Sequence, residues 1–220
     1  MAQTQRYELE NEGLNFATQV FGKRSDVRPE SIGEPLVLMY ARMWIGADKS
    51  FEALEMLTQM EKAGYRSAEL YHLKGLAQLL AFKKPEIKLL AAKDFQSAAA
   101  LSKNEESLFA LIVALLDAKE RTKVDQVMNQ WKGLGPNAQK SVWFGLAQGL
   151  VSYTGGNKDQ AQSIWDAAEK SNKANGLWSR LRTNLSTDST YLDRDLAKSL
   201  SALLTNDSPL GSLALFGQKS

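Results

Sequence analysis

His72 is the only histidine in this 220-residue chain. A Ser-His-Asp site would have this one side chain as its base, and no motif of such sites surrounds it. A metal site built from one histidine and scattered carboxylates would lack the clustered spacing that metal ligands show. We therefore expect His72 to be a packed or surface histidine rather than a catalytic or metal-binding one.

Paired carboxylates are the second chemistry that the chain could support, because glycoside hydrolysis needs only an acid and a base at a suitable separation. Neither Glu52 with Glu55 nor Glu105 with Glu106 stands out from ordinary charge on a solvated helix. The Gly-Gly pair at 155–156 lacks the strand, spacing and lysine of a phosphate-binding loop. The sequence predicts a non-enzymatic protein without a cofactor or metal. A helical enzyme with a carboxylate-based site is the alternative.

The number and distribution of charged residues bear on whether the protein binds nucleic acid. The net charge is +2 and Lys and Arg are spread along the chain, unlike the concentrated basic surface that nucleic acids bind. The densest basic stretch contains Lys83, Lys84, Lys88 and Lys93 with acidic residues between them, so we expect a solvated helix face or loop there. The sequence predicts no nucleic-acid partner.

Cysteine is absent, which excludes disulfides, thiolate metal sites and cysteine nucleophiles. The N-terminal residues lack the basic and then apolar pattern of a signal segment, and no run reaches the ~18 apolar residues of a membrane span. As written, the sequence predicts a soluble, cytoplasmic protein without a transmembrane segment. A periplasmic or membrane-anchored protein whose N-terminal segment was removed would have the same sequence.

Apolar residues recur at helical spacing along most of the chain, and no segment alternates with the period of a strand. We expect an all-α fold with an N-terminal helix and linker over 1–33, four helical hairpins over 34–175, and C-terminal helices with an apolar tail over 176–220. Asp48 is expected to cap a helix start, and Pro85 suits a first helical turn. The expected helices cover residues 6–22, 35–45, 49–63, 68–82, 87–102, 105–118, 122–132, 138–153, 158–172, 176–184 and 189–204.

Four sets of residues repeat along the hairpin region. In each set a small residue is followed after four positions by a bulky apolar one and after three more by another small or apolar residue. The first members are separated by 38, 33 and 37 residues, a period typical of a helical-hairpin array. A compact helical bundle with ordinary core packing is the alternative. The sets are Ala53, Leu57 and Met60; Ala91, Phe95 and Ala98; Val124, Met128 and Trp131; and Ala161, Trp165 and Ala168.

The fourth pair resembles a tetratricopeptide repeat, through Gly149, Gly156, Ala161, Trp165 and Ala168. A small residue on the first helix of such a repeat lets the two helices approach, and an aromatic residue on the second helix packs into the groove. The resemblance covers about residues 34 to 175 and implies a right-handed superhelix of antiparallel helix pairs, with extra helices at both ends. Further matching residues are Ala41, Trp44, Ala53 and Leu57 in pair one, Tyr71, Gly75, Ala91, Phe95 and Ala98 in pair two, and Pro136 after pair three.

This sequence departs from the repeat pattern at several first-helix positions. Lys74, Gln78, Gln148 and Ser152 stand where apolar residues are common, and Ile112 stands where a small residue is expected. The departures put the register of the first and third repeats in doubt. They also prevent the assignment of a subfamily.

The resemblance implies a concave groove lined by the first helices. An apolar groove suits an apolar peptide or an amphipathic helix better than a carboxylate-ended peptide, which needs charged donors. So large an apolar surface must be covered by a partner protein, by the chain's own termini, or by a second copy. The implied groove residues are Leu38, Arg42, His72, Leu76, Phe109, Val113, Leu116, Trp143, Leu146, Leu150 and Tyr153.

The function expected from these features is that of a non-enzymatic adaptor or scaffold that captures or positions another protein. In bacteria, arrays with this resemblance often serve as secretion-system chaperones, pilus-assembly factors or envelope scaffolds, so the resemblance implies a role of that kind. A self-associating structural protein is a further alternative, beside the helical enzyme.

Overall fold

The computed structural model describes residues 33–171 and 191–200, and every regular element within these ranges is a helix. The all-α class predicted from the sequence is confirmed for this part of the chain. The helices expected over 6–22 and 176–184 and the apolar tail lie outside the described residues. The described helices are α2 (Glu34–Gly46), α3 (Ser50–Lys62), α4 (Ala68–Ala81), α5 (Pro85–Ser102), α6 (Glu105–Asp117), α7 (Arg121–Gly133), α8 (Pro136–Gln139), α9 (Val142–Thr154), α10 (Lys158–Ser171) and α12 (Tyr191–Arg194).

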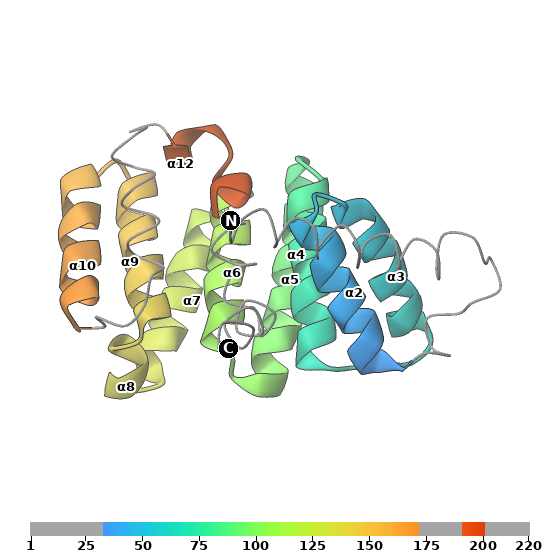
Figure 1. Cartoon of the computed structure of the whole chain (residues 1–220). Helices are drawn as coiled ribbons and strands as arrows, with labels where there is room; N and C mark the ends of the chain where they lie inside the picture. The colour runs from blue at the N-terminus through green and yellow to red at the C-terminus, as the bar shows by residue number, and fades with distance from the viewer. Residues whose placement is uncertain (1–32, 172–190, 201–220) are drawn as a thin grey trace, which may run out of the picture.

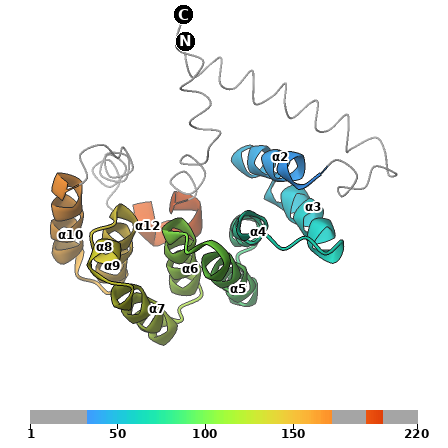
Figure 2. The same cartoon turned by 90° about the horizontal axis from the view of Figure 1, so that it is seen from below.

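The helices form four hairpins that stand side by side in sequence order: α2 with α3, α4 with α5, α6 with α7, and α9 with α10 (Figure 1). The short α8 lies between the third and fourth hairpins, and α6 also packs directly against α9. Figure 2 places α2, α4, α6 and α9 toward one side of the array, and α3, α5 and α7 toward the other. We call the side formed by α2, α4, α6 and α9 the first-helix face.

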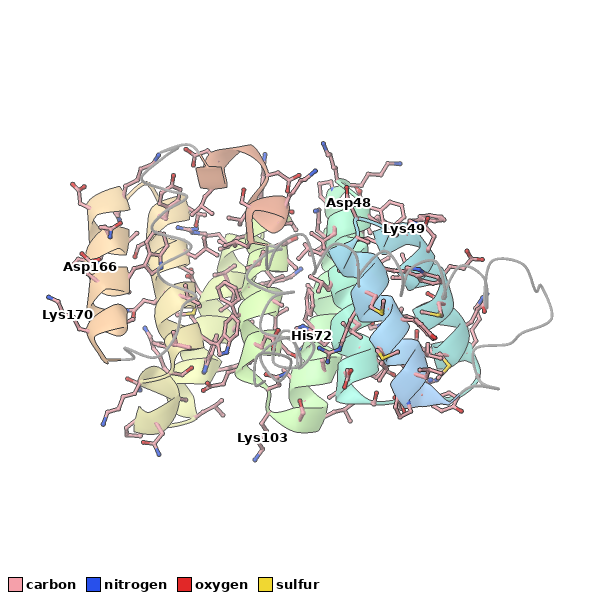
Figure 3. All side chains as sticks on the ribbon, in the orientation of Figure 1. Asp48, Lys49, His72, Lys103, Asp166 and Lys170 are labelled. Carbon is pink, nitrogen blue, oxygen red and sulfur yellow. The ribbon has the colours of Figure 1, made fainter. Side chains whose placement is uncertain are left out.

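The turns alternate between two edges of the array. Asp48 and Lys49, in the turn within the first hairpin, lie at one edge, and Lys103, in the turn between the second and third hairpins, lies at the other (Figure 3). The first helices of the hairpins therefore run in the same direction. None of the described helices combines the length and the apolar character needed to cross a membrane.

Local sequence signals account for most helix starts. Ser67 Oγ accepts the backbone N–H of Leu70 at 3.1 Å and begins α4, while Asn104 Oδ1 accepts the N–H of Glu106 at 2.9 Å and begins α6. Such side chains satisfy N–H groups that have no partner within the helix. Pro85 is in the first turn of α5, as the sequence predicts.

Two local expectations are wrong. Asp48 does not cap α3, because its backbone has φ 62° and residue Lys49 precedes the first helical residue without a side-chain cap. The helix expected over 138–153 is interrupted: α8 ends at Gln139, and α9 begins at Val142. Ser141 explains the new start, since its Oγ accepts the N–H of Trp143 at 3.2 Å.

The four repeated sets mark the buried side of the second helices. Eleven of the twelve residues are buried, and the twelfth, Ala168, is partly buried and packs against the same apolar core. This is the periodicity expected for a helix that presents one stripe to its neighbours. The repeated pattern thus corresponds to repeated packing of α3, α5, α7 and α10.

Two hairpins depend on a glycine that faces an aromatic ring. A Cβ atom at Gly149 would lie 2.0 Å from Trp165 Nε1, and one at Gly75 would lie 2.9 Å from Phe95 Cε1. Neither position has room for a side chain without movement of the ring. The expectation that a small first-helix residue permits close approach is confirmed for pairs two and four.

Polar residues in the second hairpin make specific contacts between helices. Lys74 Nζ lies 2.6 Å from Glu61 Oε2 and 3.2 Å from Asp94 Oδ2, so one ammonium joins α3, α4 and α5. Lys88 is only 4% exposed, which corrects its assignment to a solvated face. Its Nζ donates to Leu79 O at 2.6 Å and lies 2.8 Å from Asp117 Oδ2, and so joins α5 to α4 and α6.

Candidate functional site

All eleven predicted groove residues lie on the helices of the first-helix face, but most of them are buried in the folded chain. Arg42, Leu116 and Trp143 keep intermediate exposure. Burial of the other eight means that they form no open apolar groove in this structure. These eight are Leu38, His72, Leu76, Phe109, Val113, Leu146, Leu150 and Tyr153.

Aromatic contacts join α6, α9 and α10. The rings of Phe109 and Trp143 are 5.3 Å apart, and Phe109 is 1% exposed. Tyr153 stacks on Trp165 with ring centroids 6.1 Å apart, and the Trp165 indole N–H donates to Leu146 O at 3.3 Å. Phe109 is thus a core residue, whereas Trp143 combines a packed ring with partial access to solvent.

An ion pair crosses from α2 to α4 at one end of the face. Arg42 Nε donates to Glu69 Oε1 at 3.0 Å, and Arg42 Nη2 lies 2.8 Å from the same oxygen. The Arg42 side chain is 18% exposed and that of Glu69 is 44% exposed, so solvent screens part of this attraction. The pair joins α2 to α4 and places two charged side chains beside the apolar residues of the first-helix face.

His72 is held between α4, α5 and α6. Its Nδ1 is 2.9 Å from Ser107 Oγ, its Nε2 is 3.6 Å from Glu106 Oε1, and its ring meets the Phe95 ring edge to face with centroids 5.5 Å apart. Burial, together with the smaller effect of the nearby positive charge of Arg42, lowers the pKa of His72 to about 4. The imidazole is therefore neutral at physiological pH.

The grouping of Ser107, His72 and Glu106 has the residue types of a nucleophile, a base and a carboxylate, and sequence analysis did not foresee it. Ser107 has an exposed fraction of 0%, so a substrate has no access to its hydroxyl. The hydroxyl instead satisfies a buried ring nitrogen that would otherwise lack a partner. We assign this grouping to cohesion between α4 and α6, in agreement with the expected packed histidine.

Residues 191–200 contact the first-helix face at α6 and α9, away from α2. Figures 1 and 2 both place α12 and the residues after it beside α6 and α9, on the side away from α7. Asp193 Oδ2 lies 3.2 Å from Lys158 Nζ, and that ammonium is 4.8 Å from the centre of the Tyr153 ring. The buried residues of the segment belong to the main apolar core: Leu192, Leu196, Ala197 and Leu200.

Within the described residues, no three histidine, aspartate or glutamate side chains gather closely enough to hold a metal ion. Comparison of the chain with protein-family models, with curated proteins and with solved structures gave no significant match. Function is therefore inferred from the packing and exposure of the residues themselves.

Proposed function

We propose that this chain is a non-enzymatic protein-interaction scaffold that holds an apolar peptide or an amphipathic helix of a partner on its first-helix face. The proposed arrangement is a tetratricopeptide-like right-handed superhelix. Among the roles implied by that resemblance, a secretion, pilus or envelope assembly factor, or a chaperone, fits the proposed chemistry.

The observation that carries this proposal is the repetition of one packing unit. Side-by-side hairpins whose second helices bury equivalent residues bring equivalent first helices onto one extended face. Extended faces of this kind suit the capture of another chain, because equivalent positions recur along them at regular spacing.

Among the predicted groove residues, Trp143 and Leu116 are the accessible apolar ones, and binding would begin from them. Trp143 packs against Phe109 and keeps intermediate exposure, and Leu116 lies at the opposite end of α6 with similar exposure. Partly exposed aromatic side chains with a rigid packed side are common among residues that contribute most to binding free energy. Arg42 and Glu69 would add a polar rim that orients the partner.

The test compares substitutions on and off this face in the full-length protein. Trp143→Gln and Leu116→Gln should each weaken binding of a partner recovered from the native host about tenfold or more, as measured by calorimetry with the purified partner. Leu101→Gln is the matched control, because Leu101 lies on α5 and is 57% exposed. Circular dichroism checks that helicity is unchanged. Equal affinity of both face variants and wild type would refute the proposed site.

A further inference from the structure

Residues 191–200 have the pattern of an amphipathic helical ligand. Leu192, Leu196 and Leu200 recur every four residues and are 4%, 8% and 1% exposed, whereas Asp193 and Lys198 are exposed. Leu196 and Leu200 belong to one helical stretch and, being four residues apart, lie on the same side of it. One side of this segment is therefore buried in the apolar core and the other side faces solvent.

The helical structure of the segment is interrupted once. The α12 helix has four residues, Asp195 is not helical, and residues 196–200 form a second helical stretch. Asp195 Oδ1 accepts the N–H of Lys198 at 2.9 Å and so begins that stretch. A four-residue helix such as α12 is unstable alone in water, so this part of the segment depends on its contact with the array for its helical form.

A weak polar contact accompanies the apolar one. The side chains of Lys158 and Asp193 are 53% and 48% exposed, and exposed pairs of this kind contribute little to stability. The contact has a defined geometry, however, because the same ammonium lies over Tyr153, one of the predicted groove residues. The segment thus presents leucines to the core and an acidic residue to a lysine at the edge.

We propose that residues 191–200 are a detachable occupant of the α6/α9 part of the first-helix face, and that the partner's helix replaces them there. The replacing helix has leucines, or apolar residues of similar size, at four-residue intervals, with an acidic residue beside the first of them to contact Lys158. This inference rests on the proposed function. It adds the chemistry of the partner's helix and a way in which residues 191–200 control its access to the face. The partner can bind only those molecules in which the segment has left the face. Its apparent dissociation constant therefore equals the intrinsic constant divided by the fraction of such molecules.

The test uses the full-length chain and a fluorescent synthetic peptide of its own residues 189–204. In the double variant Leu196→Asp/Leu200→Asp, buried carboxylates would disfavour docking of the segment, so the face should be vacated. The peptide should bind this variant at least about tenfold more tightly than wild type, as measured by fluorescence anisotropy. Leu90→Asp/Leu101→Asp, which places the same two charges on exposed positions of α5, should bind the peptide no better than wild type.

Several outcomes would overturn the proposal. If the double variant keeps its helicity but does not bind the peptide, the array has no binding site that exists independently of the attached segment. A double variant that loses helicity throughout shows that residues 191–200 are an integral part of the core. Light scattering would detect a dimer if two copies exchanged this segment. The occupant of the face would then be the segment of a second copy and not of the same chain.

Failure of this inference can be distinguished from failure of the proposed function. If the peptide binds the vacated variant and the host partner does not compete with it, the detachable occupant stands and the proposed function is wrong. If the partner binds wild type and the double variant equally, the proposed function stands and the segment does not control access.

Discussion

A glycine faces an aromatic ring in both the α4/α5 and the α9/α10 hairpins, but the surroundings of the two contacts differ. Around Gly75 and Phe95 lie a neutral buried histidine and two lysines held by carboxylates. In the α9/α10 hairpin, the Trp165 ring that faces Gly149 is stacked on the Tyr153 ring. The same close approach of two helices is thus supported by a polar network in one hairpin and by ring packing in the other.

This difference indicates how the stability of each hairpin should respond to substitutions and to pH. Buried charges are stable only with their partners, so the α4/α5 region should be sensitive to charge removal and to pH. Ring packing depends on shape, so the α9/α10 region should be sensitive to added volume. The predictions that follow compare the two regions through the free energy of unfolding.

The largest effect is expected from Lys88→Met, which removes the ammonium that joins α4, α5 and α6. It leaves Asp117 without its cation and the Leu79 carbonyl without its donor. We expect a loss of about 3–5 kcal/mol in the free energy of unfolding, measured by urea denaturation. Lys123→Met is the control, because Lys123 pairs with Glu120 at 3.3 Å on the surface and its loss should cost less than about 1 kcal/mol. Equal losses in both variants would contradict a stabilising polar network.

A smaller effect is expected from acid, through His72. Its pKa is about 4 in the folded chain and 6.5 in the reference state, so the unfolded chain binds the proton more readily between these values. Stability from this residue is therefore full above pH 6.5 and is lost as the pH falls toward 4. The difference amounts to about 2–3 kcal/mol at pH 4.5.

Carboxylates also titrate in this range, so the measurement compares wild type with His72→Gln at pH 7.5 and pH 4.5. The acid-induced loss of stability should be smaller in the variant by about the stated amount. Urea midpoints at the two pH values give the comparison. Identical acid-induced losses in both proteins would show that His72 is protonated as easily in the folded chain as in the unfolded one.

The smallest effects separate the two glycines. Overlap of the new methyl group with the Trp165 ring should cost about 2–3 kcal/mol in Gly149→Ala, and the looser contact with Phe95 about 1 kcal/mol in Gly75→Ala. The better helix propensity of alanine contributes about 1 kcal/mol in the opposite direction, so the net loss should be about 1–2 kcal/mol for Gly149→Ala and close to zero for Gly75→Ala. Gly133→Ala is the control, because a Cβ atom there meets nothing within 4 Å. Thermal denaturation ranks the three, and a larger loss for Gly75→Ala would reverse the comparison.

Sequence reasoning located the helices well because their ends carry local signals. Pro85 and the four repeated sets identify helix starts and buried stripes without any knowledge of distant contacts. It failed at Asp48, whose backbone conformation depends on how the turn closes, and at Ser141, whose capping bond competes with continuation of one helix. Both failures concern short segments in which two local structures have similar free energies.

The candidate site was less predictable than the helices. The sequence places Leu76, Phe109 and Leu146 on first helices, but their burial depends on what packs over them. The contact of His72 with Ser107 spans 35 positions in the sequence, and no spacing rule predicts it. The prediction of a partner-binding groove stays a prediction, and Trp143 and Leu116 are the accessible residues through which it can be tested.

The sequence by itself determined the all-helical class of the described residues and the hairpin period, because these follow from local propensity and from the spacing of apolar residues. Tertiary structure decided which polar groups are buried and which apolar residues remain accessible. Lys88 illustrates this: its neighbours in the sequence suggest a solvated face, but α4 and α6 enclose it and supply an acceptor and a carboxylate. Burial and pairing depend on atoms brought together from distant positions, and only the packed array brings them together.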